Sequence, residues 1–473
     1  MGQPNVLLVV LDSVRAKNTS LHNYPIKTTP NIDAFAEKAT YYEQARAPGI
    51  HSIASHASIF SGYEVEEHKL FEHEAKLDDD ASIWPELVED YNYSTGLFTP
   101  NVVVSEASNL ADHFQYTAGP KRLTHPETGL TLRDFEGEVS TKEFIKEAIR
   151  HEKPIRSLTN GLSYKLRNYN SQSHNPEAEQ AEVYLSEFFN WNDRQDGPWA
   201  ACINLMDAHY PYVAQPEFRL YDDKKLRSLL DYFEGAMSQQ VLSDGSWWAL
   251  ATLEYLYDEC IRQVDAAVKS LINELKRRNQ YDNTLIVVTS DHGEAFGEYS
   301  QVSPSVRLCD HSWGIHEVQT HVPLVVKHPN QTEGKQIQKP ASLVEFPNVI
   351  RQTLTNKETP SFVPESESVL SSTYRVPESD GLLPSNVEKS NYIGPWRAVY
   401  KECESGIVKQ ATHGDDGATI HINTAQESCV ESRTYPTEVD EIFSTLTDAR
   451  VNIGSKQTDS DVEEHLEALG YMR

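Results

Sequence analysis

Five short apolar runs constrain the fold of this chain more than any other feature. They are rich in Val, Ile and Leu and comprise Val6–Leu11, Gly96–Phe98 with its flanks, Ala201–Met206, Leu285–Thr289 and Val322–Lys327. Continuous apolar runs of this length predict parallel strands that are covered on both faces. Helical patterns separate them, and the clearest repeats apolar residues every three and four positions from about Leu253 to Leu275. This alternation predicts an α/β doubly wound fold, with a mostly parallel central sheet and helices on both faces.

Two further regions depart from this alternation. Residues 120–180 are polar with mixed charges, and we interpret them as an insertion or lid within a catalytic domain that spans 1–355. Later apolar runs, such as Trp396–Tyr400 and Ala418–Ile422, are separated by Gly and Asp turn signals, which predict a small antiparallel sheet. A capping-box pattern near the end of the chain predicts a terminal helix. We therefore expect a C-terminal α+β subdomain over 356–473.

Composition limits the binding partners and the cellular compartment that we expect for this protein. The chain has 473 residues, with 42 Lys and Arg against 71 Asp and Glu, so its formal net charge is −29. Such a surface disfavours nucleic acid and anionic membranes as partners. It is typical of adaptation to high salt, and it predicts a source such as a halophilic archaeon. No apolar stretch reaches the ~18 residues of a membrane span, no signal peptide is recognised, and the five scattered cysteines fit a reducing compartment, so we expect a cytoplasmic protein.

Acidic residues follow three of the apolar runs. They are Asp12, Asp207 and Asp291, and the last two have a histidine within two residues, His209 and His292. Ligands of an open parallel sheet bind at the carboxyl ends of its strands. Carboxylates that converge there repel one another unless a cation neutralises them. The pattern therefore indicates a metal site, and the alternative is that these acids only cap helices.

A segment of small and hydroxyl-bearing residues runs from Ala47 to Gly62. It predicts a loop that turns into a helix close to Ser52. A hydroxyl at a helix N-terminus is well placed to act on an anion, because the unpaired N–H groups and the helix dipole stabilise negative charge. The same pattern is also that of an ordinary helix cap, so the segment by itself leaves both interpretations open.

Six motifs in chain order resemble those of the sulfatase family of the alkaline phosphatase superfamily. The Ser52–Gly62 segment lies on the family signature "C/S-x-P-S-R-x-x-L-x-T-G", and the end of Tyr281–Glu294 is similar to its "TSDHGE" strand end. The other four are Pro4–Arg15, Thr28–Ala36, Asn204–Tyr212 and His316–Leu324. Together they span nearly the whole chain, and their shared order makes the resemblance specific.

The resemblance implies a metal centre and a nucleophile. Asp12, Asp291 and His292 would bind one divalent metal ion, which is calcium in the family pattern. Zinc or manganese are alternatives, since imidazole suits them as well. Ser52 would be the nucleophile and a further metal ligand.

The same resemblance implies groups that assist the leaving group. His209 and His311 take this role, and His316 is the fallback for His311 because the spacing to the motif is loose. A second metal or additional substrate contacts would involve Asp207, His316, His56 and Arg15, and His209 and His311 could also supply ligands of a second metal.

Two departures from the family pattern leave alternatives open. Ser13 stands where the family often has a second Asp, and His56 replaces the signature Arg, which belongs to the recognition signal for conversion of the nucleophile to formylglycine. His56 thus argues against that conversion. We predict metal-dependent hydrolysis of sulfate esters, with a small anionic ester such as a sulfated carbohydrate as substrate. The alternatives are a phosphodiesterase, phosphonate hydrolase or phosphoglycerol-type transferase that uses unmodified Ser52, and a non-catalytic relative that binds an anion or glycan.

Overall fold

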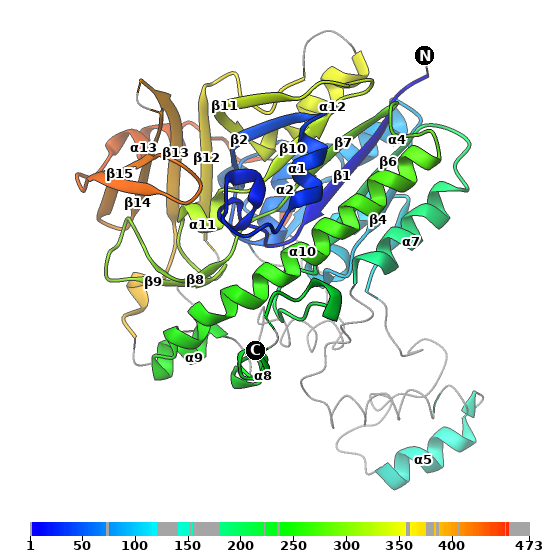
Figure 1. Cartoon of the computed structure of the whole chain (residues 1–473), viewed down its shortest axis with the longest axis horizontal. Helices are drawn as coiled ribbons and strands as arrows, with labels where there is room; N and C mark the ends of the chain where they lie inside the picture. Colours follow the sequence, from blue (N-terminus) through cyan, green and yellow to red (C-terminus); the bar gives the residue numbers. More distant parts are fainter. Residues whose placement is uncertain are drawn as a thin grey trace. The chain divides into compact units, whose positions relative to one another are not determined.

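A computed structural model gives the structure of the chain (Figure 1). It describes residues 2–71, 75–120, 141–151, 153–154, 157, 180–221, 223–233, 237–355, 360–374, 383–384, 387–404, 406–449 and 451–453. The chain divides into two compact units. One comprises Met1–Gly119 with Gln180–Arg473, and the other comprises Pro120–Glu179, where helix α5 (Thr141–Arg150) is described. The division expected near residue 355 falls inside the first unit and stays a prediction.

The central sheet has eight strands in the order β11-β2-β10-β7-β1-β6-β4-β5. Strand β1 lies in the middle and is parallel to both of its neighbours, so that Leu7 is opposite Ala201 on one side and Ile286 on the other. The strands are β1 (Asn5–Leu11), β2 (Thr40–Arg46), β4 (Ser94–Phe98), β5 (Tyr116–Ala118), β6 (Trp199–Leu205), β7 (Thr284–Thr289), β10 (Leu324–Lys327) and β11 (Lys335–Ser342).

Strand β10 differs from the prediction in its direction. It pairs antiparallel with both β7 and β2, whereas the apolar run at Val322–Lys327 was predicted to be a parallel strand. The connection from β7 explains this. It contains the hairpin of β8 (Ala295–Tyr299) and β9 (Arg307–Asp310) and the short helix α11 (Glu317–Thr320), with no helix of crossover length. A parallel return needs a crossover of a dozen or more residues, usually a long helix that carries the chain back along the sheet.

Helices cover both faces of the sheet, as the sequence predicts. Leu7, Val9 and Leu11 point into one core, which contains the buried residues of α7 (Ala181–Asn192) and α10 (Trp247–Arg277). The alternate residues of β1 point into the opposite core, with the apolar side chains of α2 (Ser52–Ser61), α4 (Ile83–Glu89) and α12 (Phe346–Thr355). Helix α10 contains the predicted Leu253–Leu275 pattern and begins six residues earlier. In Figure 1 this long helix runs across one face of the sheet beside α7.

The C-terminal region forms a second, antiparallel sheet, which confirms the predicted fold class. Its five strands run in chain order and are β12 (Ser368–Thr373), β13 (Trp396–Cys403), β14 (Gly406–His413), β15 (Asp416–Ile422) and β16 (Ser428–Ser432). The remaining helices and strands are α1 (Pro30–Ala36), α3 (Val65–His68), β3 (Ala75–Leu77), α8 (Lys224–Arg227), α9 (Met237–Asp244), α13 (Thr437–Phe443) and β17 (Val451–Ile453). The terminal helix predicted from Ser460 lies outside the described residues. Among the helices that the structure describes, none combines the length and apolar character needed to cross a bilayer.

Candidate active site

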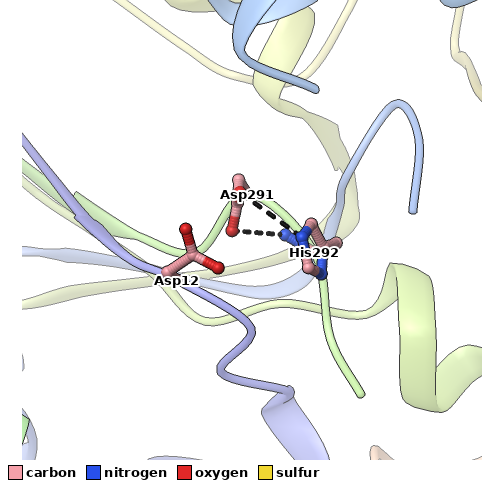
Figure 2. A group of neighbouring side chains, drawn as sticks. All are labelled: Asp12, Asp291 and His292. Atoms are coloured by element: carbon pink, nitrogen blue, oxygen red, sulfur yellow. Dashed lines mark hydrogen bonds and ion pairs between the residues drawn. The ribbon is translucent and has the colours of Figure 1, made fainter. Parts of the chain in front are cut away.

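Asp12, Asp291 and His292 meet at the carboxyl edge of the central sheet (Figure 2). Asp12 directly follows β1, and the other two residues follow the neighbouring parallel strand β7. One ligand atom from each of the three lies within 4.8 Å of the other two. All three side chains are fully buried. The sequence prediction of this trio therefore agrees with the geometry, because parallel neighbours end at the same edge.

Local contacts orient these donors toward one another. The Ser13 N–H donates to Asp291 Oδ1 (3.3 Å), and Ser13 has a left-handed φ of 64° that turns the chain sharply after Asp12. His292 Nδ1 lies 3.0 Å from the Gly293 carbonyl oxygen, so Nδ1 carries the proton and Nε2 presents a lone pair. This arrangement of an imidazole nitrogen and two carboxylates suits a divalent cation.

The charge balance of the site also fits a cation. Asp291 Oδ2 is buried and has no hydrogen-bond partner in the described part of the chain. Burial raises the pKa of Asp12, but the electrostatic influence of the adjacent His209 and His292 and the Asn101 hydrogen bond outweigh it, so the pKa lies below its usual value. Asp12 is therefore a carboxylate, and two buried carboxylates side by side are stable only with positive charge nearby.

Ser52 is the first residue of α2, and its hydroxyl faces the trio. Its Oγ lies 3.3 Å from His292 Nε2 and accepts a hydrogen bond of 3.3 Å from Asn101 Nδ2. The helix begins here because His51 has extended backbone angles, while Ser52 and the residues after it are helical. The unpaired N–H groups of the first helical turn are therefore available to an anion beside the hydroxyl.

Asn101 is a site residue that the sequence analysis missed. Its Nδ2 also donates to Asp12 Oδ2 at 2.8 Å, and its Oδ1 accepts from the Val103 and Val104 N–H groups. Asn204 donates to the same Asp12 oxygen at 3.2 Å. Asn204 is the last residue but one of β6, which neighbours β1, and Asn101 lies just after β4, the next strand on that side. The sequence signal that could have identified both residues is an amide side chain close to the end of a predicted strand.

Three further histidines lie around this centre. His56 is one turn after Ser52, with Nδ1 2.9 Å from the Ser52 carbonyl oxygen and 3.6 Å from Asp291 Oδ2. His209 Nδ1 lies 2.7 Å from the Tyr210 carbonyl oxygen. The ring centroid of His311 is 4.5 Å from that of His292 and 5.4 Å from that of His209. The structure thus brings His56, His209 and His311 together with the predicted nucleophile.

A second group of donors adjoins the first. Glu294, Asp310 and His311 each offer a ligand atom within 4.8 Å of the other two. His311 belongs to this group, and the sequence analysis also offered it as a ligand of a second metal. Glu294 and Asp310 were not predicted.

Three predicted site residues lie elsewhere, namely Asp207, His316 and Arg15. Asp207 accepts from Gln263 Nε2 at 2.7 Å, and burial raises its pKa to about 6. His316 caps α11, where its Nδ1 accepts from the Val318 N–H, and so it is no substitute for His311.

Arg15 does not reach toward an anion. It is fully buried and forms ion pairs with Glu254 and Glu298, and its Nη1 donates to the Glu294 carbonyl. A guanidinium already paired with two carboxylates is neutralised where it lies. Its position three residues after Asp12 in the chain therefore misled the sequence interpretation.

Comparison with known proteins places the chain in a family. The sequence profile of the family described as Sulfatase matches residues 4–354. The chain belongs to the sulfatase family. Sulfatases are ester hydrolases and generally use a divalent metal, so the protein is an enzyme that hydrolyses ester bonds.

Curated relatives are similar at low identity. A protein named sulfatase from Formosa agariphila is 21% identical over 366 residues, which cover 73% of this chain and 68% of the relative. An N-acetylglucosamine-6-O-sulfatase from Bacteroides thetaiotaomicron is 20% identical over 69% of this chain and 63% of the relative. The alignment therefore spans about two thirds of each relative.

Solved structures share the fold over nearly the whole chain. The phosphonate monoester hydrolase of Agrobacterium radiobacter superposes with a TM-score of 0.55 at 16% identity, covering 99% of this chain and 94% of that one. A protein solved with D-glucosamine-2-N,6-O-disulfate gives a TM-score of 0.54 at 13% identity, covering 99% and 98%. These matches establish an alkaline phosphatase-like fold.

Proposed function

We propose that this enzyme hydrolyses sulfate esters, with Ser52 as the nucleophile and a divalent cation held by Asp12, Asp291 and His292. The observation that supports this most is the position of Ser52 Oγ, 3.3 Å from His292 Nε2 and beside the buried carboxylates. When bound, a divalent cation would polarise the ester oxygens and lower the pKa of the serine hydroxyl. The first turn of α2 would stabilise the charge on the non-bridging oxygens.

In this proposal the protein's own groups divide the remaining work. Asn101 links Asp12 to Ser52 through its amide and so keeps the hydroxyl near the acids. His209 and His311 hold and protonate the oxygen of the leaving group. His56 lies against the Ser52 backbone and lines the side of the site near Asp291.

A sulfated carbohydrate is the proposed substrate class. One curated relative is named for cleavage of a 6-O-sulfate from N-acetylglucosamine, and one structure with the same fold holds a disulfated glucosamine. Calcium as the bound cation, a halophilic source and a cytoplasmic location stay predictions from the sequence.

The second candidate function is hydrolysis or transfer of phosphate or phosphonate esters. His56 supports it, because His56 replaces the signature Arg one turn after the nucleophile and so favours an unmodified serine. A serine alkoxide can attack phosphorus directly. A phosphonate monoester hydrolase shares the fold, which is compatible with this chemistry.

Activity and peptide-mass measurements test both functions. The purified protein would be assayed with 4-nitrophenyl sulfate, phosphate and phenylphosphonate, with chelator or with calcium, manganese or zinc added. Ser52→Ala should abolish the activity, whereas Ser55→Ala, on the same helix, should retain it. Loss of two hydrogens from the Ser52 peptide would identify formylglycine and support sulfate ester hydrolysis. Full activity of Ser52→Ala would disprove the assignment of the nucleophile.

A further inference from the structure

Glu294 and Tyr212 are motif residues that the proposed function leaves without a role. The Glu294 Oε1 lies 3.2 Å from His311 Nδ1, and the Glu294 Oε2 accepts a hydrogen bond of 3.3 Å from the Tyr212 hydroxyl. Glu294 ends the "TSDHGE"-like motif, and Tyr212 ends the motif that contains His209. Both carboxylate oxygens of Glu294 are thereby directed, one toward a histidine and the other toward a tyrosine.

The register of the β8–β9 hairpin brings Glu294 and His311 together. Ala295 pairs with Asp310 and Phe296 with Cys309 in this antiparallel ladder. One step beyond the last pair, the residues opposite each other are Glu294 and His311, and side chains of directly opposed residues are neighbours. Glu294 and His311 are 17 residues apart in the sequence because the hairpin between them has that length. The periodicity of a helix or strand cannot predict such a contact.

The surroundings make this contact strong. Glu294 and Tyr212 are fully buried, and the Tyr212 ring packs against Tyr257 and Phe296 at centroid distances of 5.6 Å. In such an apolar setting a charge-assisted hydrogen bond is stronger than in water. The Glu294 N–H donates to the Val318 carbonyl at 3.0 Å, which fixes the backbone as well. Glu294 thus presents a rigid carboxylate to the imidazole.

We propose that Glu294, held by Tyr212, is a positioning residue that fixes the ring orientation and tautomer of His311. With the Nδ1 proton directed to Glu294, Nε2 is the atom that exchanges a proton with the substrate. The His311 ring lies against His292, whose Nε2 is next to Ser52 Oγ. The inference rests on the proposed function of Ser52.

The chemical step is balanced in this arrangement. Ser52 reacts as the alkoxide, after its hydroxyl proton has passed to solvent. As the bond from Ser52 Oγ to sulfur forms, the bond from sulfur to the leaving oxygen breaks, and that oxygen takes the proton from His311 Nε2. The Nδ1 proton remains on the ring and continues to donate to Glu294. When water later attacks the sulfur, the bond from sulfur to Ser52 Oγ breaks and the alkoxide is restored. One proton of that water returns to His311 Nε2, and the other leaves with the released hydrogen sulfate.

Asp310 provides the competing interpretation and the matched control. It completes the donor group with Glu294 and His311, so the three could instead hold a second cation. The two roles make different predictions for Asp310→Asn. A positioning role for Glu294 leaves the metal content of Asp310→Asn and of Glu294→Gln unchanged, whereas a metal site would lose its cation in both variants.

The test measures kcat/KM for a series of aryl esters whose leaving groups range from good to poor. The esters are sulfates, phosphates or phosphonates, whichever the enzyme hydrolyses fastest as the 4-nitrophenyl ester. Glu294→Gln should lower kcat/KM by about 10²-fold for the poorest leaving groups and by less than about tenfold for the 4-nitrophenyl ester. A graded loss is expected because a good leaving group needs no proton. Tyr212→Phe should give a smaller loss with the same dependence, and Glu294→Asp should restore part of the activity. Metal content and the unfolding transition would be measured for each purified variant.

Two results would overturn the inference. One is an equal loss for all leaving groups in Glu294→Gln, which would indicate a structural role. The other is loss of one equivalent of metal in both Glu294→Gln and Asp310→Asn. Ser52→Ala in the same assay separates the two proposals. If it is inactive while Glu294→Gln behaves as wild type, only the positioning role is wrong, and if it is active, the nucleophile assignment fails first.

Discussion

Asn101→Asp is the perturbation that tests the candidate metal centre most directly. The asparagine amide donates to Asp12 Oδ2 at 2.8 Å, and its Oδ1 accepts from the N–H groups of Val103 and Val104. Aspartate retains the two bonds to the backbone and replaces only the donor with a second carboxylate. The substitution therefore changes the charge beside Asp12 and little else.

The expected cost follows from the distance. Two negative charges 2.8 Å apart repel by about 6 kcal/mol at an effective dielectric constant of ~20. Proton uptake or rotation of the side chain would relieve part of this, so we expect a loss of about 3–6 kcal/mol in the free energy of unfolding when a chelator is present. Asn101→Ala loses a hydrogen bond to a charged acceptor, which costs about 1.5–3 kcal/mol. A bound cation should restore much of the loss in Asn101→Asp, because the added carboxylate faces the site.

Urea unfolding with chelator and with a saturating divalent cation measures this difference. Asn109→Asp is the matched control, since Asn109 is also a buried asparagine, and it bonds the backbone of Leu77. Its loss of stability should not depend on the cation. Equal recovery of both variants, or no recovery of Asn101→Asp, would refute the assignment of a cation to Asp12.

Three further predictions concern the framework of the site. Gly293→Ala should cost about 3 kcal/mol or more and weaken metal binding, because a Cβ would lie 2.1 Å from the Val318 carbonyl oxygen. Gly197→Ala, where nothing lies within 4 Å, is the control in unfolding and metal-content measurements. Burial raises the pKa of Asp207 from 3.8 to about 6, so the folded protein binds that proton more tightly and loses about 3 kcal/mol of stability as the pH rises from ~4 to ~6. Asp207→Asn should remove that slope and be the more stable protein above pH ~6 in unfolding measured across pH, and an unchanged slope would contradict the prediction. Lys409→Met should cost about 3 kcal/mol in thermal unfolding, because Lys409 is buried and pairs with Glu317 at 3.1 Å. The partly exposed Lys401, changed in the same way, should cost less than about 1 kcal/mol, and equal losses would contradict this reasoning.

The sequence by itself determined the layers of the fold and the approach of the acids that follow β1 and β7. A continuous apolar run indicates a strand that is buried on both faces of a sheet, and β1, β6 and β7 lie where the sequence has such runs. Because parallel strands end at a common edge, the acids that follow β1 and β7 had to approach each other. These inferences need only local pattern and one general rule of topology, whereas the choice of His292 as a ligand came from the resemblance to the sulfatase family.

Only the tertiary structure decided which other side chains join the trio. Asn101 meets Asp12 across 89 positions of sequence, and the pairing of Ala295 with Asp310 selects His311 over His316. The antiparallel direction of β10 and the ion pairs that turn Arg15 toward α10 also depend on how distant segments pack. A periodic pattern specifies the face of an element that is buried. It does not specify the register between elements, which is set by the lengths of turns and by packing across the whole core.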